Sequence, residues 1–361
     1  MEKITFECEV VTPMFMGGAA PNEAELRPPS IKGALRFWWR AMKAEDKRED
    51  LIEEEEKIFG GTRISMGKQK GKSSSFKLKV NPNIKVSRSL KDEYALKNDR
   101  NGGKDAGILY LLYSTVLQSG IRFIKPGSTF KIEINFPVPV KEEDEIETHV
   151  FNSLWLSIYL GGFGSRSRRF GGNIKVLGTD NYRGPLEFCP PSAAEIEDWY
   201  KQNLSFIKTN KKTKKYSNLS EYNIYIPSDI LDGWDSWRKT INRIGSEYLK
   251  FRKNKPFVDR LVFGLPITGK SSAELYVDDD NVDDDKKKSR RRASPLIFHI
   301  TKSKDNKFIP VLTILNGMFM PSNSIIKGKV KNRPFEKKLG DSDFGTIKEF
   351  IKKLGVRRIE L

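Results

Sequence analysis

Apolar and polar residues alternate in three segments of the first half of the chain, over 4–10, 76–80 and 129–136. A period of two residues is typical of strands that bury one face. The segment 150–160 is apolar on nearly every side and long enough for a buried helix, and 174–177 has the pattern of a short strand. The pattern predicts a sheet that is covered by helices on a single face.

A helix is predicted to begin at Ser30, which follows two prolines as a suitable N-cap, and to extend to about residue 44. Its apolar residues form one face at helical spacing, while Lys32, Arg36 and Arg40 fall four residues apart on another. Such a cationic stripe can follow a nucleic-acid backbone. The three aromatic residues after Arg36 fit either core packing or a stacking face for an unpaired base.

The first half contains one more predicted helix, over 50–58. The second half shows the same kinds of pattern, which predict helices over 193–207, 237–251 and 344–354, and strands over 222–226, 261–265, 296–301 and 308–315. The segment 87–107 is polar and charged, and we interpret it as an insertion loop. We therefore expect an α+β fold made of two similar units, residues 1–180 and 181–361.

The balance of charge narrows the choice of partner. The 361 residues carry 65 Lys and Arg against 47 Asp and Glu, a net charge of +18, which favours nucleic acid or anionic lipid. No apolar run approaches the roughly 18 residues of a membrane span, and the N-terminus lacks the pattern of a signal peptide, so the expected location is cytoplasmic. Cys8 and Cys189 lie far apart and support neither a disulfide framework nor a thiolate metal site.

The segment 161–172, GGFGSRSRRFGG, combines five glycines with three arginines. Glycine lets a backbone approach a ligand closely, and Arg166, Arg168 and Arg169 within four positions favour an anionic ligand. The segment lies between a predicted buried helix and a predicted strand, which suits a loop presented to a phosphate backbone. The alternative is a solvated surface loop without a ligand.

Residues suited to catalysis are few. A metal-independent ribonuclease requires a general acid and a general base with a pKa near 7, and the chain has two histidines, His149 and His299. His299 is expected on the outer face of its strand. The sequence contains no Ser-His-Asp order, Walker loop, dinucleotide fingerprint or HExxH motif, and the charged tract 278–292 lacks the spacing of a calcium loop. We predict no catalytic residue, no metal and no cofactor.

Several segments, in order along nearly the whole chain, resemble the RAMP superfamily. The most specific are RPPSIKGALRFWWR at 27–40 and RRASPL at 291–296. The others are the Thr-Pro and Gly-Gly pairs within 12–18, IFG at 58–60, the glycine-rich loop at 161–172 and FGLP at 263–266. Within the superfamily, the chain is similar to the first subunits of the Cmr complexes, which are type III-B CRISPR effectors.

This resemblance implies two tandem ferredoxin-like (RRM-like) domains with antiparallel sheets and a glycine-rich loop. It also implies a non-catalytic RNA-binding subunit of a Cmr ribonucleoprotein, whose partners are CRISPR guide RNA near its 3′ region, target RNA and other Cmr subunits. Two alternatives remain open: a metal-independent RAMP endoribonuclease that processes CRISPR RNA, and a structural spacer subunit with little RNA contact.

The predicted RNA-binding residues share a place on or beside the cationic segments described above. They are Gly162, Gly164, Arg166, Arg168 and Arg169 on the glycine-rich loop, Lys32, Arg36 and Arg40 on the first helix, and Arg291 and Arg292 in the second unit.

Overall fold

The structure, a computed structural model, describes most of the chain. The described ranges are 3–18, 23–65, 68–97, 103–117, 120–137, 145–207, 211–230, 232–269, 271–277, 291–320, 324–337 and 344–361.

The first unit is built on a four-stranded antiparallel sheet with the order β4-β7-β1-β8. Its strands and helices follow the chain as β1 (Ile4–Val10), α1 (Pro28–Lys43), β4 (Lys77–Asn83), β7 (Thr129–Asn135), α6 (Ile146–Tyr159) and β8 (Ile174–Asp180). The βαββαβ order and the strand order together are those of a ferredoxin-like fold. The alternating burial along β1 and β7 follows the alternation of the sequence, with the apolar residues facing α1 and α6.

The second unit repeats this topology with the strand order β11-β12-β9-β15. Its elements are β9 (Asn218–Pro227), α8 (Trp237–Asn254), β11 (Leu296–Lys302), β12 (Phe308–Asn316), α9 (Gly345–Lys353) and β15 (Val356–Arg358). All paired strands of this sheet are antiparallel. The predicted fold class, two tandem ferredoxin-like units with antiparallel sheets, is confirmed.

The other elements are insertions between these strands and helices. In the first unit they are α2 (Arg48–Phe59), β2 (Gly61–Ser65), β3 (Lys68–Lys72), β5 (Val86–Ser87), α3 (Leu90–Glu93), α4 (Ala106–Leu111), α5 (Tyr113–Leu117) and β6 (Phe123–Ile124). The units are joined through the 3-10 helix η2 (Ala193–Glu195) and α7 (Ile196–Phe206), and the second unit adds the 3-10 helix η3 (Val258–Phe263), β10 (Ser272–Val277), β13 (Ser324–Val330) and β14 (Arg333–Lys337).

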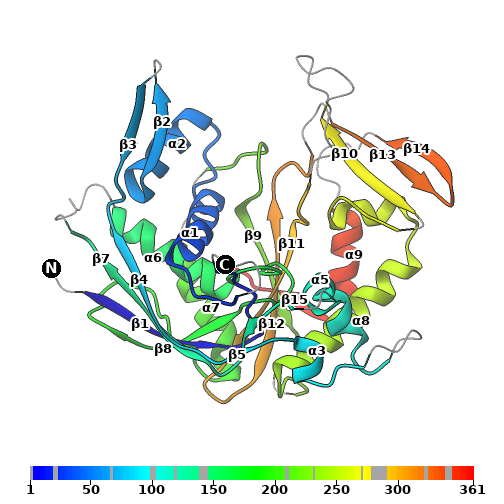
Figure 1. The fold of residues 1–361 in the computed structure, drawn as a ribbon, viewed down its shortest axis with the longest axis horizontal. Coiled ribbons are helices and arrows are strands. Elements are labelled where there is room, and N and C mark those ends of the chain that lie inside the picture. The colour runs from blue at the N-terminus through cyan, green and yellow to red at the C-terminus, as the bar shows by residue number, and fades with distance from the viewer. Residues whose placement is uncertain are drawn as a thin grey trace.

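The two units stack in layers. Figure 1 shows the first sheet at the lower left, α1 and α6 beside it, the second sheet in the centre, and α8 and α9 on the far side. Ile297 and Val311 of the second sheet belong to the same core as α1 and α6, whereas Phe298 and Leu312 belong to the core of α8 and α9. The second sheet is therefore buried on both faces, and the expectation of helices on a single face is wrong for it.

Packing crosses position 180 in both directions. Trp199 of α7 contacts Trp155 of α6, with ring centroids 5.3 Å apart, and α4 packs closely against α8. The last strand of the first sheet ends at Asp180. The division into residues 1–180 and 181–361 stays a proposal, since each side contributes to the core of the other.

Three local expectations are corrected. The first helix begins at Pro28 rather than after Ser30, because proline is well suited to the first positions of a helix, where no N–H is needed. The apolar run 261–265, predicted as a strand, lies largely in the 3-10 helix Val258–Phe263. The segment 87–107, predicted as a loop, contains α3 and the start of α4.

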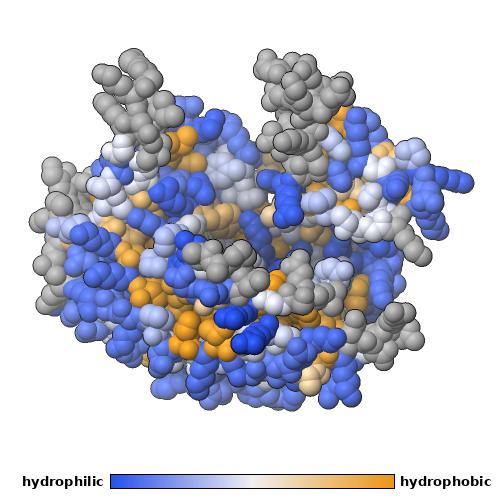
Figure 2. Space-filling model, in the orientation of Figure 1, coloured by the Kyte–Doolittle hydropathy of each residue, from blue (hydrophilic) through white to orange (hydrophobic). Residues whose placement is uncertain are grey.

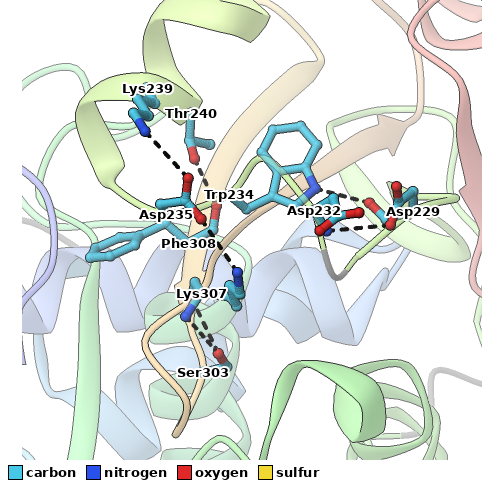
Figure 3. Close-up of polar contacts among 9 residues, drawn as sticks. All are labelled: Asp229, Asp232, Trp234, Asp235, Lys239, Thr240, Ser303, Lys307 and Phe308. Atoms are coloured by element: carbon cyan, nitrogen blue, oxygen red, sulfur yellow. Dashed lines mark hydrogen bonds and ion pairs between the residues drawn. The ribbon is translucent and has the colours of Figure 1, made fainter.

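The connection between β9 and α8 is tied to the second sheet (Figure 3). Trp234 donates its indole N–H to the carbonyl of Asp229 at 2.9 Å, and the carbonyl of Trp234 accepts the N–H of Phe308 at 2.7 Å. Thr240 of α8 donates to the carbonyl of Phe308 at 2.8 Å, and Asp235 pairs with one lysine of α8 and one of the β11–β12 turn. These bonds fix the start of α8 against β12.

Candidate nucleic-acid interface

The glycine-rich loop, residues 161–172, joins the two units through backbone hydrogen bonds. The N–H of Phe170 donates to the carbonyl of Phe298 at 3.1 Å, and the N–H of Phe298 donates to the carbonyl of Arg168 at 3.2 Å. Phe298 lies on β11, the edge strand of the second sheet. The loop thus satisfies polar groups that an edge strand leaves open, and it is held on both sides rather than free.

Two of the predicted glycines are required by the path of the loop itself. Gly164 has φ +87°, and a Cβ there would lie 2.5 Å from the carbonyl oxygen of Phe15. A Cβ on Gly162 would lie 2.6 Å from the carbonyl oxygen of Gly171. Glycine at these positions lets the backbone fold against itself and against the segment after β1.

Arg168 lies where the loop meets α1. Its guanidinium stacks over the ring of Phe37 with 4.9 Å to the centroid, and its Nη1 donates to the carbonyl of Ser294 at 2.7 Å. Burial lowers the pKa of Arg168 to about 10, and the neighbouring charges of Arg292 and Arg169 add to the shift. A guanidinium in this position remains charged at neutral pH.

Arg166 and Arg169 leave the loop in other directions. Arg166 donates from Nε and Nη2 to the hydroxyl of Ser114 on α5, at 2.9 and 2.5 Å. Arg169 lies over the ring of Tyr248 at 4.9 Å and donates to the carbonyl of Phe263 at 3.2 Å. Burial lowers the pKa of Arg166, as does the charge of Arg169. The three loop arginines are brought together by sequence but reach different parts of the protein.

The arginines of α1 face α2. Arg36 and Arg40 share the carboxylate of Glu55, at 3.0 Å and 2.7 Å. Arg36 also donates to the carbonyls of Phe59 and Gly60 at the end of α2. The structure therefore gives this pair a packing role between two helices, which helical spacing alone did not indicate.

The remaining predicted cations have other contacts. The amino group of Lys32 is 4.7 Å from the ring centroid of Phe76, and burial lowers its pKa. Arg291 is exposed. Arg292 donates to the carbonyl of Met318 at 2.5 Å, and burial lowers its pKa.

A cavity of about 180 Å³ lies where α1, the loop and β11 meet. It is lined by Ala34, Phe37, Trp38, Gly161, Gly162, Ser167, Arg168 and Ile297. In the space-filling view the molecule is hollowed between the lobe that carries α1 and α2 and the lobe that carries β10 (Figure 2). The cavity offers a guanidinium, an aromatic ring and backbone polar groups within one small space.

Positive charge around the loop is not balanced by carboxylates. Within the described ranges, none of the partly buried arginines of this region forms an ion pair: Arg166, Arg168, Arg169 and Arg292. They donate to hydroxyl and carbonyl oxygens, which do not cancel their charge, and Nη1 of Arg169 is buried without a partner among the described residues. The arrangement can therefore attract an anion.

Neither histidine is exposed. His299 is fully buried, which corrects the expectation of a sheet-surface residue: its Nδ1 lies 2.8 Å from the carbonyl of Gly161 and its Nε2 3.1 Å from the hydroxyl of Thr301. Burial lowers the pKa of His299 to about 3. His149 lies inside α6 with its ring against the edge of Trp39, and burial also lowers its pKa.

Asn173, just beyond the loop, was not singled out from the sequence. Its Nδ2 donates to the carbonyl of Gly161 at 2.8 Å, and its Oδ1 accepts the N–H of Ile300 at 3.0 Å. Its own N–H donates to the hydroxyl of Thr12 at 2.8 Å. One amide thus ties the start of the loop to β11, and the only sequence signal was a polar residue directly before an apolar strand.

The outer face of the first sheet carries ion pairs. Lys131 pairs with Glu7 at 2.6 Å and Lys3 with Glu133 at 2.8 Å. The aromatic residue of β1, Phe6, faces the core and is fully buried. The ring of Phe6 is therefore not available to stack a base on the outer face.

Among the residues that the structure places, no group of three or more His, Cys, Asp and Glu side chains could hold a metal ion. Within the same residues, no helix has both the length and the apolar character to cross a membrane. Most of the charged tract 278–292 lies outside the described residues. Both cysteines are free thiols, and Cys8 is buried whereas Cys189 is exposed.

Comparison with known proteins gives consistent matches. The RAMP superfamily model matches residues 7–175. The CRISPR system Cmr subunit Cmr1-1 of Pyrococcus furiosus is 27% identical over 281 residues, 72% of this chain and 76% of the relative. Subunit Cmr1-2 of the same organism is 30% identical over 186 residues, 49% of this chain and 96% of the relative.

Solved structures agree in fold. The crystal structure of apo Cmr1 from Pyrococcus furiosus has a TM-score of 0.61 at 22% identity and covers 99% of each chain. A chain of the type III-B Cmr-beta complex bound to cognate target RNA and AMPPnP has a TM-score of 0.58 at 14% identity, covering 97% of this chain and 98% of that one. The 30% identity to subunit Cmr1-2 over nearly its whole length, together with the superfamily match, shows that the chain belongs to the RAMP superfamily and, within it, to the family of Cmr1 subunits.

Proposed function

We propose that the chain is a non-catalytic RNA-binding subunit of a type III-B CRISPR ribonucleoprotein, in which it contacts guide RNA near its 3′ region, target RNA, or both. The proposal is supported by relatives named as Cmr subunits and by a similar fold in a Cmr-beta complex bound to cognate target RNA. Other Cmr subunits are its proposed protein partners.

One observation carries the proposal: arginines without carboxylate partners surround the glycine-rich loop. Arg168 combines a charged guanidinium with the ring of Phe37 at the cavity between α1 and β11. A guanidinium plane can contact a phosphate through its N–H groups and an unpaired base through its face. RNA is thus proposed to cross the loop, with Arg168 as its nearest anchor.

The other predicted residues have different proposed roles in this interface. Arg166 and Arg169 supply charge beside Arg168, whereas Gly162 and Gly164 shape the loop. Lys32, Arg36 and Arg40 remain a proposed extension, but Arg36 and Arg40 share one carboxylate and contribute less charge than their number indicates. Arg291 and Arg292 are proposed to border the path on the second unit.

Replacing Arg166, Arg168 and Arg169 together with Ala tests the loop. Affinity for single-stranded RNA should fall, and the slope of log K against log salt should shrink by about two, because roughly 0.7 counterions are released per phosphate contact. A matched control replaces three exposed lysines of α9, Lys348, Lys352 and Lys353, and should leave the slope nearly unchanged. An unchanged slope in the loop variant would remove the loop from the RNA surface.

The non-catalytic part of the proposal has a separate test. The pure protein, incubated with labelled repeat RNA in EDTA, should leave the RNA intact, since both nitrogens of His299 are engaged by protein groups. Specific cleavage that His149→Ala or His299→Ala abolishes would establish the endoribonuclease instead.

A spacer role is favoured by one observation: hydroxyl and carbonyl oxygens of the protein already hold the loop arginines. Crosslinking to RNA in the assembled complex separates the two functions. An RNA-binding subunit should crosslink at the loop, and a spacer should not.

A further inference from the structure

A second pocket lies at the opposite end of α6 from the glycine-rich loop. It has a volume of about 380 Å³ and lies where the start of α6, the segment after β8 and the end of α7 meet. The 14 residues of α6 place it roughly 20 Å from the loop, at 1.5 Å per residue. It is lined by Ile4, Glu147, Thr148, Phe151, Asn152, Asn181, Tyr182, Arg183, Gly184, Pro185 and Phe206. A volume of this size accommodates a small-molecule ligand.

The pocket is lined by an amide that makes no hydrogen bond with another described residue. Asn152 is only 7% exposed, lines the pocket, and makes no hydrogen bond with any residue that the structure places. Its amide atoms are not sealed in the core but can be reached from the pocket, where they are open to a ligand. An amide offers two donors and one acceptor, the combination that reads the edge of a nucleobase.

Tyr182 adds a donor to the same space. Its hydroxyl oxygen accepts the N–H of Leu186 at 3.3 Å, and its proton has no acceptor among the described residues. Burial raises the pKa of Tyr182 to about 12, so the hydroxyl keeps its proton at neutral pH. The phenol is therefore a second unsatisfied group at the pocket.

Aromatic side chains form the apolar part of the wall. The rings of Phe151 and Tyr182 meet edge to face with centroids 4.9 Å apart. Phe206, at the end of α7, is 45% exposed, which is unusual for a side chain of its size. An exposed ring beside unpaired polar groups is a surface on which a base can stack.

The start of α6 supplies a site for one negative charge. Its N-cap residue, Glu145, makes no side-chain capping bond, and Glu147 and Thr148 of the first turn line the pocket. The N–H groups and positive dipole end of this turn favour an anion, and Arg183 also lines the pocket. The carboxylate of Glu147 opposes a highly charged ligand, so a single phosphodiester fits better than a triphosphate.

We propose that this pocket binds one unpaired nucleotide, with its base stacked on Phe206 and hydrogen-bonded to Asn152 and Tyr182, and its phosphate at the first turn of α6. The site is separate from the glycine-rich loop and does not depend on it. The nucleotide is either part of a single-stranded RNA or a free mononucleotide, since both present the same base and phosphate.

The full chain is tested against two sets of probes: fluorescein-labelled decamers of A, C and U, by anisotropy, and the four free 5′-mononucleotides, by calorimetry. Asn152→Ala should lower affinity about tenfold for the preferred base and reduce the differences between bases, since one amide–base pair contributes roughly that discrimination. Phe206→Ala should weaken binding of all bases. Leu177→Ala, an exposed apolar residue of β8 with 46% exposure, is the matched control and should have no effect.

The outcomes separate the sources and the sites. If the variants lose affinity for the decamers alone, the pocket is assigned to RNA. If they lose affinity for the mononucleotides, it is assigned to the free ligand. The proposal is overturned if both variants bind every probe with the affinity of the wild type. This holds even if the same variants fail to assemble with other Cmr subunits. Adding the loop substitution of Arg168 should lower RNA affinity further, so a failure at the loop and a failure at the pocket are distinguishable. Thermal unfolding checks that Phe206→Ala, an exposed change, leaves the fold intact.

Discussion

Acid should loosen the junction between the two units through His299. The imidazole is fully buried between the carbonyl of Gly161 and the hydroxyl of Thr301. Burial lowers its pKa from 6.5 to about 3. A group with a lowered pKa binds protons more readily in the unfolded chain, so its contribution to stability is complete above about pH 6.5 and is lost as the pH falls toward 3.

The magnitude follows from that shift. Between pH 7.5 and pH 5 the unfolded histidine becomes mostly protonated while the folded one stays neutral, which lowers the free energy of unfolding by about 2 kcal/mol. A variant with His299→Gln keeps an N–H donor for Gly161 but does not titrate. The difference in stability between wild type and variant should therefore shrink by about 2 kcal/mol over this range.

Urea unfolding at pH 7.5, 6 and 5, followed by tryptophan fluorescence, measures this difference. Carboxylates with lowered pKa values, such as Glu45 and Asp46, titrate in both proteins and cancel in the comparison. His149→Gln is a control for the second buried histidine, whose pKa is also lowered. Parallel pH profiles for wild type and His299→Gln would refute the assignment of the pH dependence to this residue.

Two further predictions concern the loop and α1. Gly164→Ala should lower the free energy of unfolding by about 1–3 kcal/mol, since the residue has positive φ and a Cβ would meet the carbonyl of Phe15; Gly178→Ala, where a Cβ meets nothing within 4 Å, is the control in the same urea titration. Glu55→Gln should cost about 1–2 kcal/mol by leaving two partly buried guanidiniums without their carboxylate, and should raise RNA affinity if α1 lies on the RNA path. The control Glu54→Gln removes a more exposed ion pair and should change the free energy of unfolding by less than about 0.5 kcal/mol. Unchanged RNA affinity in Glu55→Gln would exclude the arginines of α1 from the RNA-binding surface.

Local periodicity was enough to predict most strands and helices of the two sheets. The alternation of apolar and polar residues predicted β1 and β7, because one face of each strand is buried and the other is in contact with solvent. It failed for 261–265, since a short apolar run fits a strand and a buried 3-10 helix equally well. The near-continuous apolar runs of β11 and β12 did carry a signal for burial on both faces, and the burial of His299 follows from it.

The partners of charged residues could not be predicted in the same way. Arg36 and Arg40 are correctly placed on one face of α1, but their carboxylate, Glu55, comes from the next helix. Helical spacing fixes which side chains share a face, whereas the crossing of two helices depends on the whole fold. For the same reason the sequence grouped the three loop arginines, although the structure sends them to different partners.

The layered packing restricts where RNA can bind. In an RRM, the open face of the sheet stacks bases on aromatic side chains. Here the second sheet is covered on both faces, and the described outer face of the first sheet carries ion pairs between Lys131 and Glu7 and between Lys3 and Glu133. The two proposed contact sites instead lie at the ends of α6, with Arg168, which has no charge partner, near its C-terminus and Asn152 near its N-terminus. The proposed nucleotide contacts of this stacked ferredoxin-like pair therefore lie at helix ends and not on its sheet faces.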